Sequence, residues 1–245
     1  MAEFTMKIAG HSARVISLFD STKDYCRNYL TEDAPEFSIS VAPEDMAYEQ
    51  QVLDEEASRE EMRRRRFTDP FLERAAIQRK FAQYLFAYDI LLFHGSAVAV
   101  DGLGYLFTAD CGTGKSTHTG LWRQVFGRRA VMVNDDKPFL QITETGVLLH
   151  GAPWSGKHGL DTNVTVPLKG LCILRRGQEN RICPIAMEQA RQMLRKQSCD
   201  PWEGDRQEDL LHLVERLGER TALWQMDCNK DPQAAATAYD AMGKE

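Results

Sequence analysis

Residues 106–117 combine an apolar run with a glycine-rich turn that ends in Gly114, Lys115 and Ser116. Glycine at positions 112 and 114 allows backbone angles that a Cβ would forbid, so consecutive N–H groups can turn toward an anion. A lysine at this point can reach the β- and γ-phosphates of a nucleotide, and the serine after it can ligate Mg²⁺. The predicted nucleotide-binding residues are Asp110, Cys111, Gly112, Thr113, Gly114, Lys115, Ser116 and Thr117.

This loop departs from the usual G-x-x-x-x-G-K-[ST] pattern only at its first position, which is Ala109. Helix-forming residues follow at 116–126, and a helix N-terminus adds unpaired N–H groups and partial positive charge where the phosphates would lie. The alternative is a chance Gly-Lys-Ser sequence at the start of a helix. The strand before the loop and the helix after it favour a phosphate-binding loop.

Two carboxylates, Asp135 and Asp136, follow the next apolar run at 131–133. A carboxylate at the carboxyl end of a strand beside a phosphate loop is well placed to ligate Mg²⁺. Two adjacent carboxylates can divide the work, one on the metal and one accepting a hydroxyl proton. The alternative is an acidic turn. Together with the loop, the pair predicts a nucleotide-dependent phosphoryl-transfer enzyme.

A second loop, residues 150–159, is rich in glycine and hydrogen-bond donors. Lys157 could neutralise a transferred phosphate and Trp154 could pack on the substrate, or the segment is an ordinary turn anchored by a buried tryptophan. Arg175 and Arg176 end an apolar run and face either phosphates or water. His94, beside another apolar run, is on its own more typical of a core or hydrogen-bonding residue.

The elements that must position these residues form an α/β pattern. Strands are expected at 91–100, 104–108, 131–133, 137–142, 146–149, 164–166, 171–174 and 223–226, with a hairpin turn at Asp101 and Gly102. Helices are expected at 70–89, at 116–126, at 186–196, at 206–217 with Gly218 as the stop, and from Asp231 onward.

The first sixty residues suggest short strands at 7–10, 15–19 and 37–41 in a small α+β or β-rich region. We expect residues 1–69 to form this region and residues 70–245 to form a catalytic domain. The N-terminal region either recruits the substrate or only completes the fold. The acidic and then basic segment 54–66 is better explained by a solvated helix than by a binding patch.

The chain has 245 residues, a net charge of −6 and 43% hydrophobic residues, which is enough for a sizeable core and unlike a nucleic-acid-binding protein. Its six cysteines include no C-x-x-C pair, so a structural zinc site is not expected and a reducing compartment fits better than a disulfide framework. No signal-peptide core or membrane-spanning segment is visible. A soluble, cytoplasmic protein is predicted, with neither nucleic acid nor membrane as a partner.

In order and spacing, His94-Gly-Ser-Ala, the glycine-rich loop and the run Val133 to Asp136 resemble the catalytic domain of HPr kinase/phosphorylase. They are more distantly similar to the nucleotide core of ATP-dependent phosphoenolpyruvate carboxykinase. The resemblance covers about residues 90–180. It implies a P-loop core of mixed β-sheet with flanking helices. The chain looks closest to HPr-kinase-like proteins encoded with peptide-modification genes, some of which phosphorylate serine in a precursor peptide.

The resemblance implies Asp135 as the base, Asp136 and Ser116 on Mg²⁺, Lys115 on the phosphates, and His94 near the transferred phosphate or the metal. It also implies a homo-oligomer. Spacing alone leaves open which aspartate does which job. The arginine-containing loop of HPr kinase is not evident, and residues 153–157 take its place. The resemblance therefore does not extend to HPr as substrate or to phosphorolysis.

These observations predict an ATP- and Mg²⁺-dependent kinase that phosphorylates a Ser or Thr hydroxyl of a peptide or small protein. Trp154, Lys157 and Arg175 are the candidate substrate-loop residues. Two alternatives stay open: a non-catalytic nucleotide-binding module that regulates folding or assembly, and a kinase for a small molecule such as free serine or a sugar.

Overall fold

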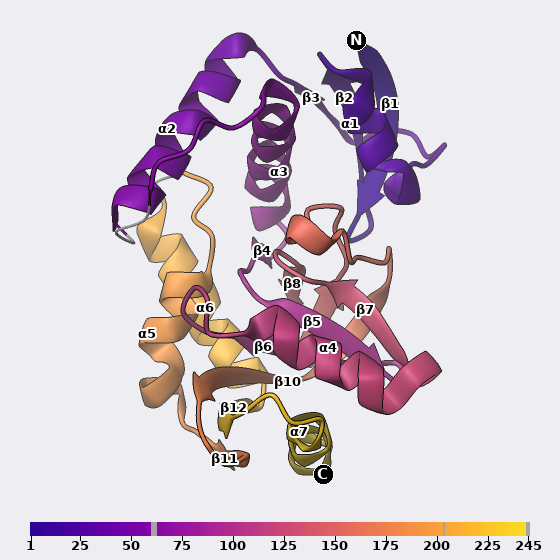
Figure 1. Ribbon diagram of the computed structural model, residues 1–245. Helices are drawn as coiled ribbons and strands as arrows, with labels where there is room; N and C mark the ends of the chain where they lie inside the picture. The colour runs from indigo at the N-terminus through magenta and orange to yellow at the C-terminus, as the bar shows by residue number, and fades with distance from the viewer. Residues whose placement is uncertain (60–62, 203, 244–245) are drawn as a thin grey trace. The chain divides into compact units, whose positions relative to one another are not determined.

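The computed structural model describes residues 1–59, 63–202 and 204–243. The chain divides into two compact units, Met1–Leu85 and Phe86–Glu245, and each is considered by itself (Figure 1). This division falls one helix later than the expected boundary between residues 69 and 70. The reason is that helix α3 (Asp69–Phe86) packs with the N-terminal strands.

The first unit contains a three-stranded sheet in the order β1-β2-β3. The bounds of its elements are β1 Ala2–Ile8, β2 His11–Ser17, α1 Asp20–Tyr25, η1 Arg27–Tyr29, β3 Phe37–Ser40, α2 Pro43–Arg59 and α3 Asp69–Phe86. The aromatic face of α3 covers the sheet, because Tyr84 stacks on Phe37 at 3.6 Å between ring centroids and Phe81 meets the same ring edge-on at 5.2 Å. Phe81 is fully buried, so this face of α3 belongs to the core of the unit.

One prediction for this unit is wrong. The basic run Arg63 to Arg66 was expected on a solvated helix, but α2 ends at Arg59 and residues 63–68 are not helical. Residues 60–62, which belong to the same prediction, lie outside the described residues. Gln50 donates hydrogen bonds to the carbonyl of Arg65 at 2.9 Å and to Asp54 at 3.1 Å, so this segment is held beside α2 by side-chain contacts.

The second unit is built on a mixed sheet into which the structure places nine strands, in the order β4-β8-β9-β10-β6-β5-β7 with β12 beside β10 and β11 beside β12. Their bounds are β4 Ile90–Leu92, β5 Ser96–Val100, β6 Leu103–Thr108, β7 Ala130–Asn134, β8 Phe139–Ile142, β9 Val147–His150, β10 Thr165–Arg176, β11 Arg181–Pro184 and β12 Leu223–Cys228. The sheet is curled, since β7, at one end of this order, also contacts β9.

Strand β10 organises the sheet. Its residues Leu171, Cys172 and Ile173 pair in parallel with β6 on one side and with β12 on the other. Parallel neighbours end at the same edge, so the loop after β6 and the arginines that end β10 lie at one edge. The strands predicted at 164–166 and 171–174 are thus a single strand, with an irregularity in register between Leu168 and Gly170.

The strand predicted at 91–100 is instead two strands, β4 and β5, which pair with different neighbours. The chain changes partners around Gly95. A Cβ at this glycine would lie only 2.8 Å from a methyl carbon of Leu106 and 3.0 Å from the carbonyl oxygen of Phe107. The close backbone approach places His94 in the gap between the two strands rather than within one.

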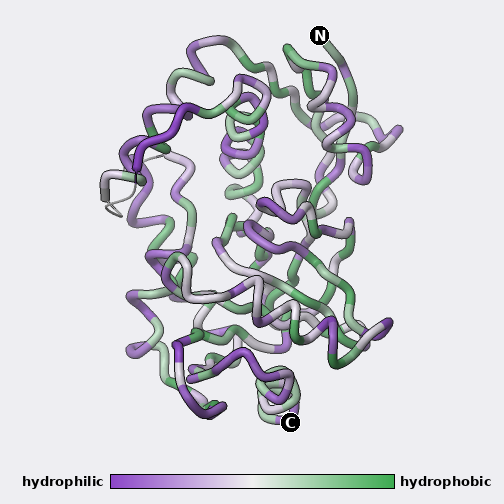
Figure 2. Tube along the Cα trace, viewed as in Figure 1, coloured by the Kyte–Doolittle hydropathy of each residue, from purple (hydrophilic) through white to green (hydrophobic). Residues whose placement is uncertain are grey.

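Helices cover both faces of this sheet (Figure 1). Their bounds are α4 Lys115–Phe126, α5 Met187–Gln197, α6 Gln207–Arg220 and α7 Gln233–Met242. Trp122 of α4 and Ala238 of α7 share one core with Phe107, whereas Leu194 of α5 and Leu213 of α6 share the other with Leu106. Successive β6 residues thus face opposite layers, as a strand requires. Figure 2 shows hydrophobic residues along these strands.

Gly218 does not stop α6, which continues to Arg220. A Cβ at this position would overlap the sulfur of Met187, the first residue of α5. The glycine therefore serves the close packing of α6 against α5 rather than a helix end.

None of the helices in the described part of the chain has both the length and the apolar composition needed to cross a bilayer.

Candidate active site

The loop between β6 and α4 has the backbone geometry of an anion cradle. Gly112 and Gly114 adopt φ angles of +73° and +122°, values that side-chain-bearing residues rarely adopt. Helix α4 begins at Lys115, directly after the second of these glycines. The unpaired N–H groups of its first turn therefore lie at the end of the loop, where they favour an anion.

Three cationic side chains from three elements contact this loop. Lys115 Nζ donates to the carbonyl of Ala109 at 3.1 Å, and Lys196 Nζ, at the end of α5, pairs with Asp110 Oδ1 at 2.7 Å. Arg176 Nη2, at the end of β10, donates to the carbonyl of Gly112 at 2.6 Å. The loop thus lies in a cationic environment suited to a polyanion.

Of the two arginines that end β10, Arg176 is the one that reaches the glycine-rich loop, whereas Arg175 was named only as a candidate substrate-loop residue. Consecutive residues of a strand face opposite sides, so only one of the two can point toward α4 and the loop. Arg175 is exposed, and its carbonyl accepts a hydrogen bond from the Cys228 thiol at 3.7 Å. No pattern in the sequence marks Lys196 as a site residue, because it lies on an amphipathic helix far from the loop along the chain.

The second loop, residues 150–159, combines a buried tryptophan with an exposed lysine. Trp154 is 6% exposed, and its ring lies edge-on to Phe139 at 6.5 Å between centroids, which favours the interpretation of a turn anchored by a buried tryptophan. Lys157 is exposed in the short helix η3 (Gly156–His158). A Cβ at Gly156 would approach that of Asp136 to 3.2 Å, so this loop runs close beside the second carboxylate.

The turn after β7 is fixed by Asn134. Its Oδ1 accepts hydrogen bonds from the backbone N–H groups of Asp136 at 2.8 Å and Lys137 at 2.6 Å. Its Nδ2 donates to the carbonyl of Ala152 at 2.7 Å. This buried amide fixes the backbone at Asp136 and Lys137 and joins the turn to the second loop.

The two aspartates differ in environment. Asp135 is 7% exposed, whereas the side chain of Asp136 is 35% exposed. Ser96 Oγ, at the start of β5, donates to Asp135 Oδ1 at 2.7 Å and lies 2.7 Å from Thr119 Oγ1 on α4. These hydroxyls join the first carboxylate to the helix that begins at Lys115. Ser96 and Thr119 were not predicted as site residues, although Ser96 lies within the motif that begins at His94.

His94 joins the loop to the second carboxylate. Its Nε2 lies 3.5 Å from Asp136 Oδ1, and its carbonyl accepts a hydrogen bond of 3.0 Å from Thr108, the last residue before the loop. Burial, followed by the positive charges of Lys115 and Lys137, lowers the pKa of His94 from 6.5 to about 3. The imidazole is therefore neutral near pH 7, the form that binds metals or accepts a hydrogen bond.

The donors present suit Mg²⁺ that arrives with a nucleotide. Ser116 is exposed in the first turn of α4, and the carboxylate of Asp136 is partly accessible. Mg²⁺ prefers oxygen ligands and is usually held by one or two carboxylates together with phosphates and water. Among the side chains that the structure describes, no three His, Cys, Asp or Glu residues form a group that could hold a metal ion by themselves.

The structure therefore brings together His94, Lys115, Asp135 and Asp136, which the sequence places in three separate segments. The other predicted loop residues, from Asp110 to Thr117, lie in the turn and the first turn of α4. Cys111 is an exposed free thiol in that turn.

Comparisons with known proteins give a likeness in fold only. No family model matches the chain, and no curated protein matches it. Among solved structures, the HPr(Ser) kinase/phosphatase from Coxiella burnetii is similar, with a TM-score of 0.39 and 11% sequence identity, over 61% of this chain and 95% of that one.

Proposed function

We propose that the protein is an ATP- and Mg²⁺-dependent kinase that transfers a phosphoryl group to a Ser or Thr hydroxyl of a peptide or small protein. The observation that carries this proposal is the convergence of the loop and the carboxylates. Asp135 is joined through Ser96 to Thr119 on the helix after the loop, and Asp136 lies 3.5 Å from His94.

Phosphate binding is assigned to the loop amides with Lys115 and Arg176. In the structure both cations contact loop carbonyls, Ala109 for the lysine and Gly112 for the arginine. The oxygens of a triphosphate are stronger acceptors for these cations than a neutral carbonyl. We therefore expect the two side chains to exchange a carbonyl for a phosphate when a nucleotide binds.

Ser116 and Asp136 are the residues that would hold Mg²⁺, and His94 borders the same place. When bound, the ion neutralises charge on the phosphate oxygens during transfer. The hydroxyl and the carboxylate are hard oxygen donors, and both are accessible to solvent.

Asp135 is proposed as the base. Its carboxylate would accept the proton of the acceptor hydroxyl while that oxygen bonds to the γ-phosphorus and the bond to the leaving ADP breaks. The hydrogen bond from Ser96 orients this carboxylate. The peptide or small-protein nature of the acceptor rests on the sequence resemblance.

The test is phosphoryl transfer by the purified full chain from γ-labelled ATP with Mg²⁺. Acceptors are a panel of Ser- and Thr-containing peptides, small proteins, free serine and sugars, and mass spectrometry locates the phosphate. We expect a phosphorylated peptide whose formation requires Mg²⁺ and Lys115. ATP binding without transfer to any acceptor would indicate a nucleotide-binding module, and transfer to a small molecule alone would replace the proposed acceptor class.

A further inference from the structure

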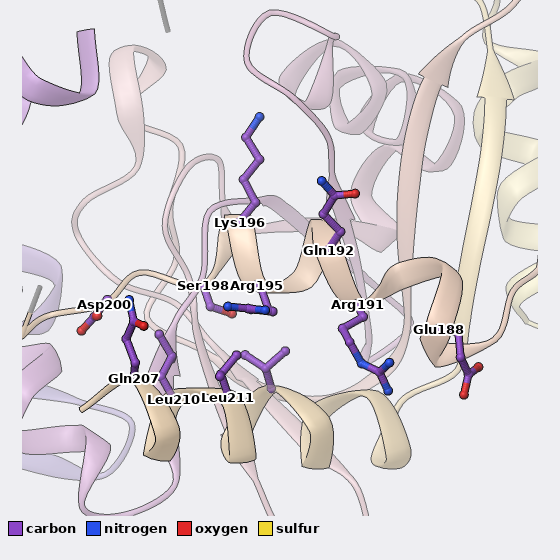
Figure 3. A pocket seen from close by; sticks show the side chains of 11 residues that line it. Glu188, Arg191, Gln192, Arg195, Lys196, Ser198, Asp200, Gln207, Leu210 and Leu211 are labelled. Carbon is purple, nitrogen blue, oxygen red and sulfur yellow. The ribbon is translucent and has the colours of Figure 1, made fainter. Parts of the chain in front are cut away.

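A groove of about 530 Å³ lies between α5 and α6, entirely within the second unit (Figure 3). Leu210 and Leu211 extend from α6 into the space between the two helices, and Val214 completes an apolar floor. The volume is within the range of ligand-binding clefts. Both leucines remain partly exposed, so the groove offers apolar surface to a partner.

The ends of the groove are fixed by charged residues that already have partners. Arg191 on α5 holds Glu215 on α6 with two hydrogen bonds of 2.7 and 3.2 Å. At the other end, the carboxylate of Asp200 accepts the backbone N–H groups of Trp202 at 2.9 Å and Gly204 at 2.8 Å. The helix spacing is therefore set, and the negative charge of Asp200 is engaged by the backbone.

On the α5 side of the groove, the acidic Glu188 lies beyond Arg191 at one end, and the charge nearer Leu210 and Leu211 is positive (Figure 3). Arg195 is exposed, and within the described ranges it has neither a hydrogen bond nor an ion pair. Lys196, the next residue, reaches from the rim to Asp110 of the phosphate loop at 2.7 Å. The groove thus combines an aliphatic floor with a guanidinium group, and its rim adjoins the loop that is proposed to bind ATP.

We propose that this groove docks an extended segment of the acceptor peptide that carries apolar side chains next to a carboxylate. The apolar side chains cover Leu210 and Leu211, and the carboxylate pairs with Arg195. The inference rests on the proposed kinase function and specifies its substrate class. A peptide fits better than nucleic acid, because the groove residues include three aliphatic side chains and no aromatic ring for base stacking.

The position of the groove gives docking a role in catalysis. Because Lys196 belongs to both the rim and the loop contact, a segment held between α5 and α6 keeps the rest of the peptide near the phosphate loop. Docking then raises the effective concentration of the acceptor hydroxyl at the site. Substitutions of Arg195 and Leu211 should raise KM for the peptide and leave the affinity for ATP unchanged.

A random 16-residue peptide library displayed on phage and selected against the full chain tests this inference without an assumed substrate. Selected peptides should share apolar residues beside Asp or Glu. Arg195→Glu and Leu211→Lys should each weaken their binding by about tenfold or more. Arg220→Glu, an equal charge reversal on an exposed residue of α6 outside the groove, should leave binding unchanged.

The same selection separates this inference from the proposed function. Lys115→Ala should keep peptide binding while losing ATP binding and transfer. If the wild-type chain docks the selected peptides but transfers phosphate to no Ser- or Thr-containing acceptor, the groove is supported and the kinase is overturned. Enriched peptides whose binding is equal in Arg195→Glu and wild type, or no enrichment, overturn the groove. A second copy of the chain in the groove would also overturn the inference. Sedimentation would then show a wild-type dimer that dissociates in Leu211→Lys.

Discussion

The hydroxyl of Ser96 donates a hydrogen bond of 2.7 Å to Oδ1 of Asp135 in a buried environment. The same hydroxyl lies 2.7 Å from Thr119 Oγ1, on the helix that follows the glycine-rich loop. A carboxylate held in this way has little freedom to turn away from the site. The contact therefore relates the orientation of the proposed base to the position of the loop.

Ser96→Ala should lower kcat by about tenfold with little change in the Kd for ATP, because it releases the carboxylate without touching the loop. Loss of the buried hydrogen bond should also cost about 1–3 kcal/mol of unfolding free energy. Steady-state kinetics and urea unfolding measure both effects. Thr143→Ala, which removes a hydroxyl bonded to Gly146 in the β8–β9 turn, is the matched control and should leave kcat unchanged.

Arg176→Ala should weaken ATP binding by about tenfold, because it removes a guanidinium group that contacts the loop at Gly112. Arg175→Ala removes the same charge from the adjacent position and should change the affinity by less than about twofold. Isothermal titration with ATP compares the two. Equal effects would mean that only the overall charge matters and that Arg176 has no specific place in the site.

His94 should remain neutral well below pH 6.5, because burial and the charges of Lys115 and Lys137 lower its pKa to about 3. Lys115→Ala removes one of these charges and should raise that pKa, and a bound triphosphate should raise it too by neutralising both. NMR titration of the imidazole measures the shift in each case. A wild-type His94 that titrates near 6.5 would contradict the electropositive environment inferred for the site.

His118 should make the protein sensitive to acid. Burial lowers its pKa to about 4, and its ring accepts a hydrogen bond from the Trp122 indole at 3.1 Å. Because the folded pKa is below the unfolded value of 6.5, the unfolded state binds more protons, and stability falls as the pH drops below 6.5. The two pKa values imply that protonation of this histidine in the unfolded state lowers the free energy of unfolding by roughly 2 kcal/mol between pH 7 and pH 5.

Urea unfolding at the two pH values checks this expectation. His118→Asn should lose stability at pH 7 but show a smaller further loss at pH 5 than the wild type. His212→Asn, which changes an exposed histidine of α6, should follow the wild type at both values. An unchanged pH dependence in His118→Asn would show that other groups cause the acid sensitivity.

Local sequence signals were enough to locate the glycine-rich turn and the elements beside it. Gly112 and Gly114 adopt the positive φ angles that only glycine adopts easily, α4 starts at Lys115, and β7 ends just before the two aspartates. These features depend on residues close together in the sequence. A pattern of glycines, a lysine and carboxylates therefore predicts them.

Contacts between distant segments could not be predicted in this way. The approach of Arg176 to Gly112 depends on the parallel pairing of β10 with β6, and that of Lys196 to Asp110 depends on where α5 packs. The prediction of one continuous strand at 91–100 is wrong for a similar reason. The segment is apolar on both sides of His94, Gly95 and Ser96, and the neighbours that close on Gly95 divide it.

If the loop and the paired aspartates form one phosphoryl-transfer site, the kinetics of Asp135→Asn with a peptide that the wild type phosphorylates will show it. We expect kcat to fall by about a hundredfold or more while the Kd for ATP stays within about threefold, because the carboxylate acts mainly in the transition state. Wild-type turnover in Asp135→Asn would contradict it.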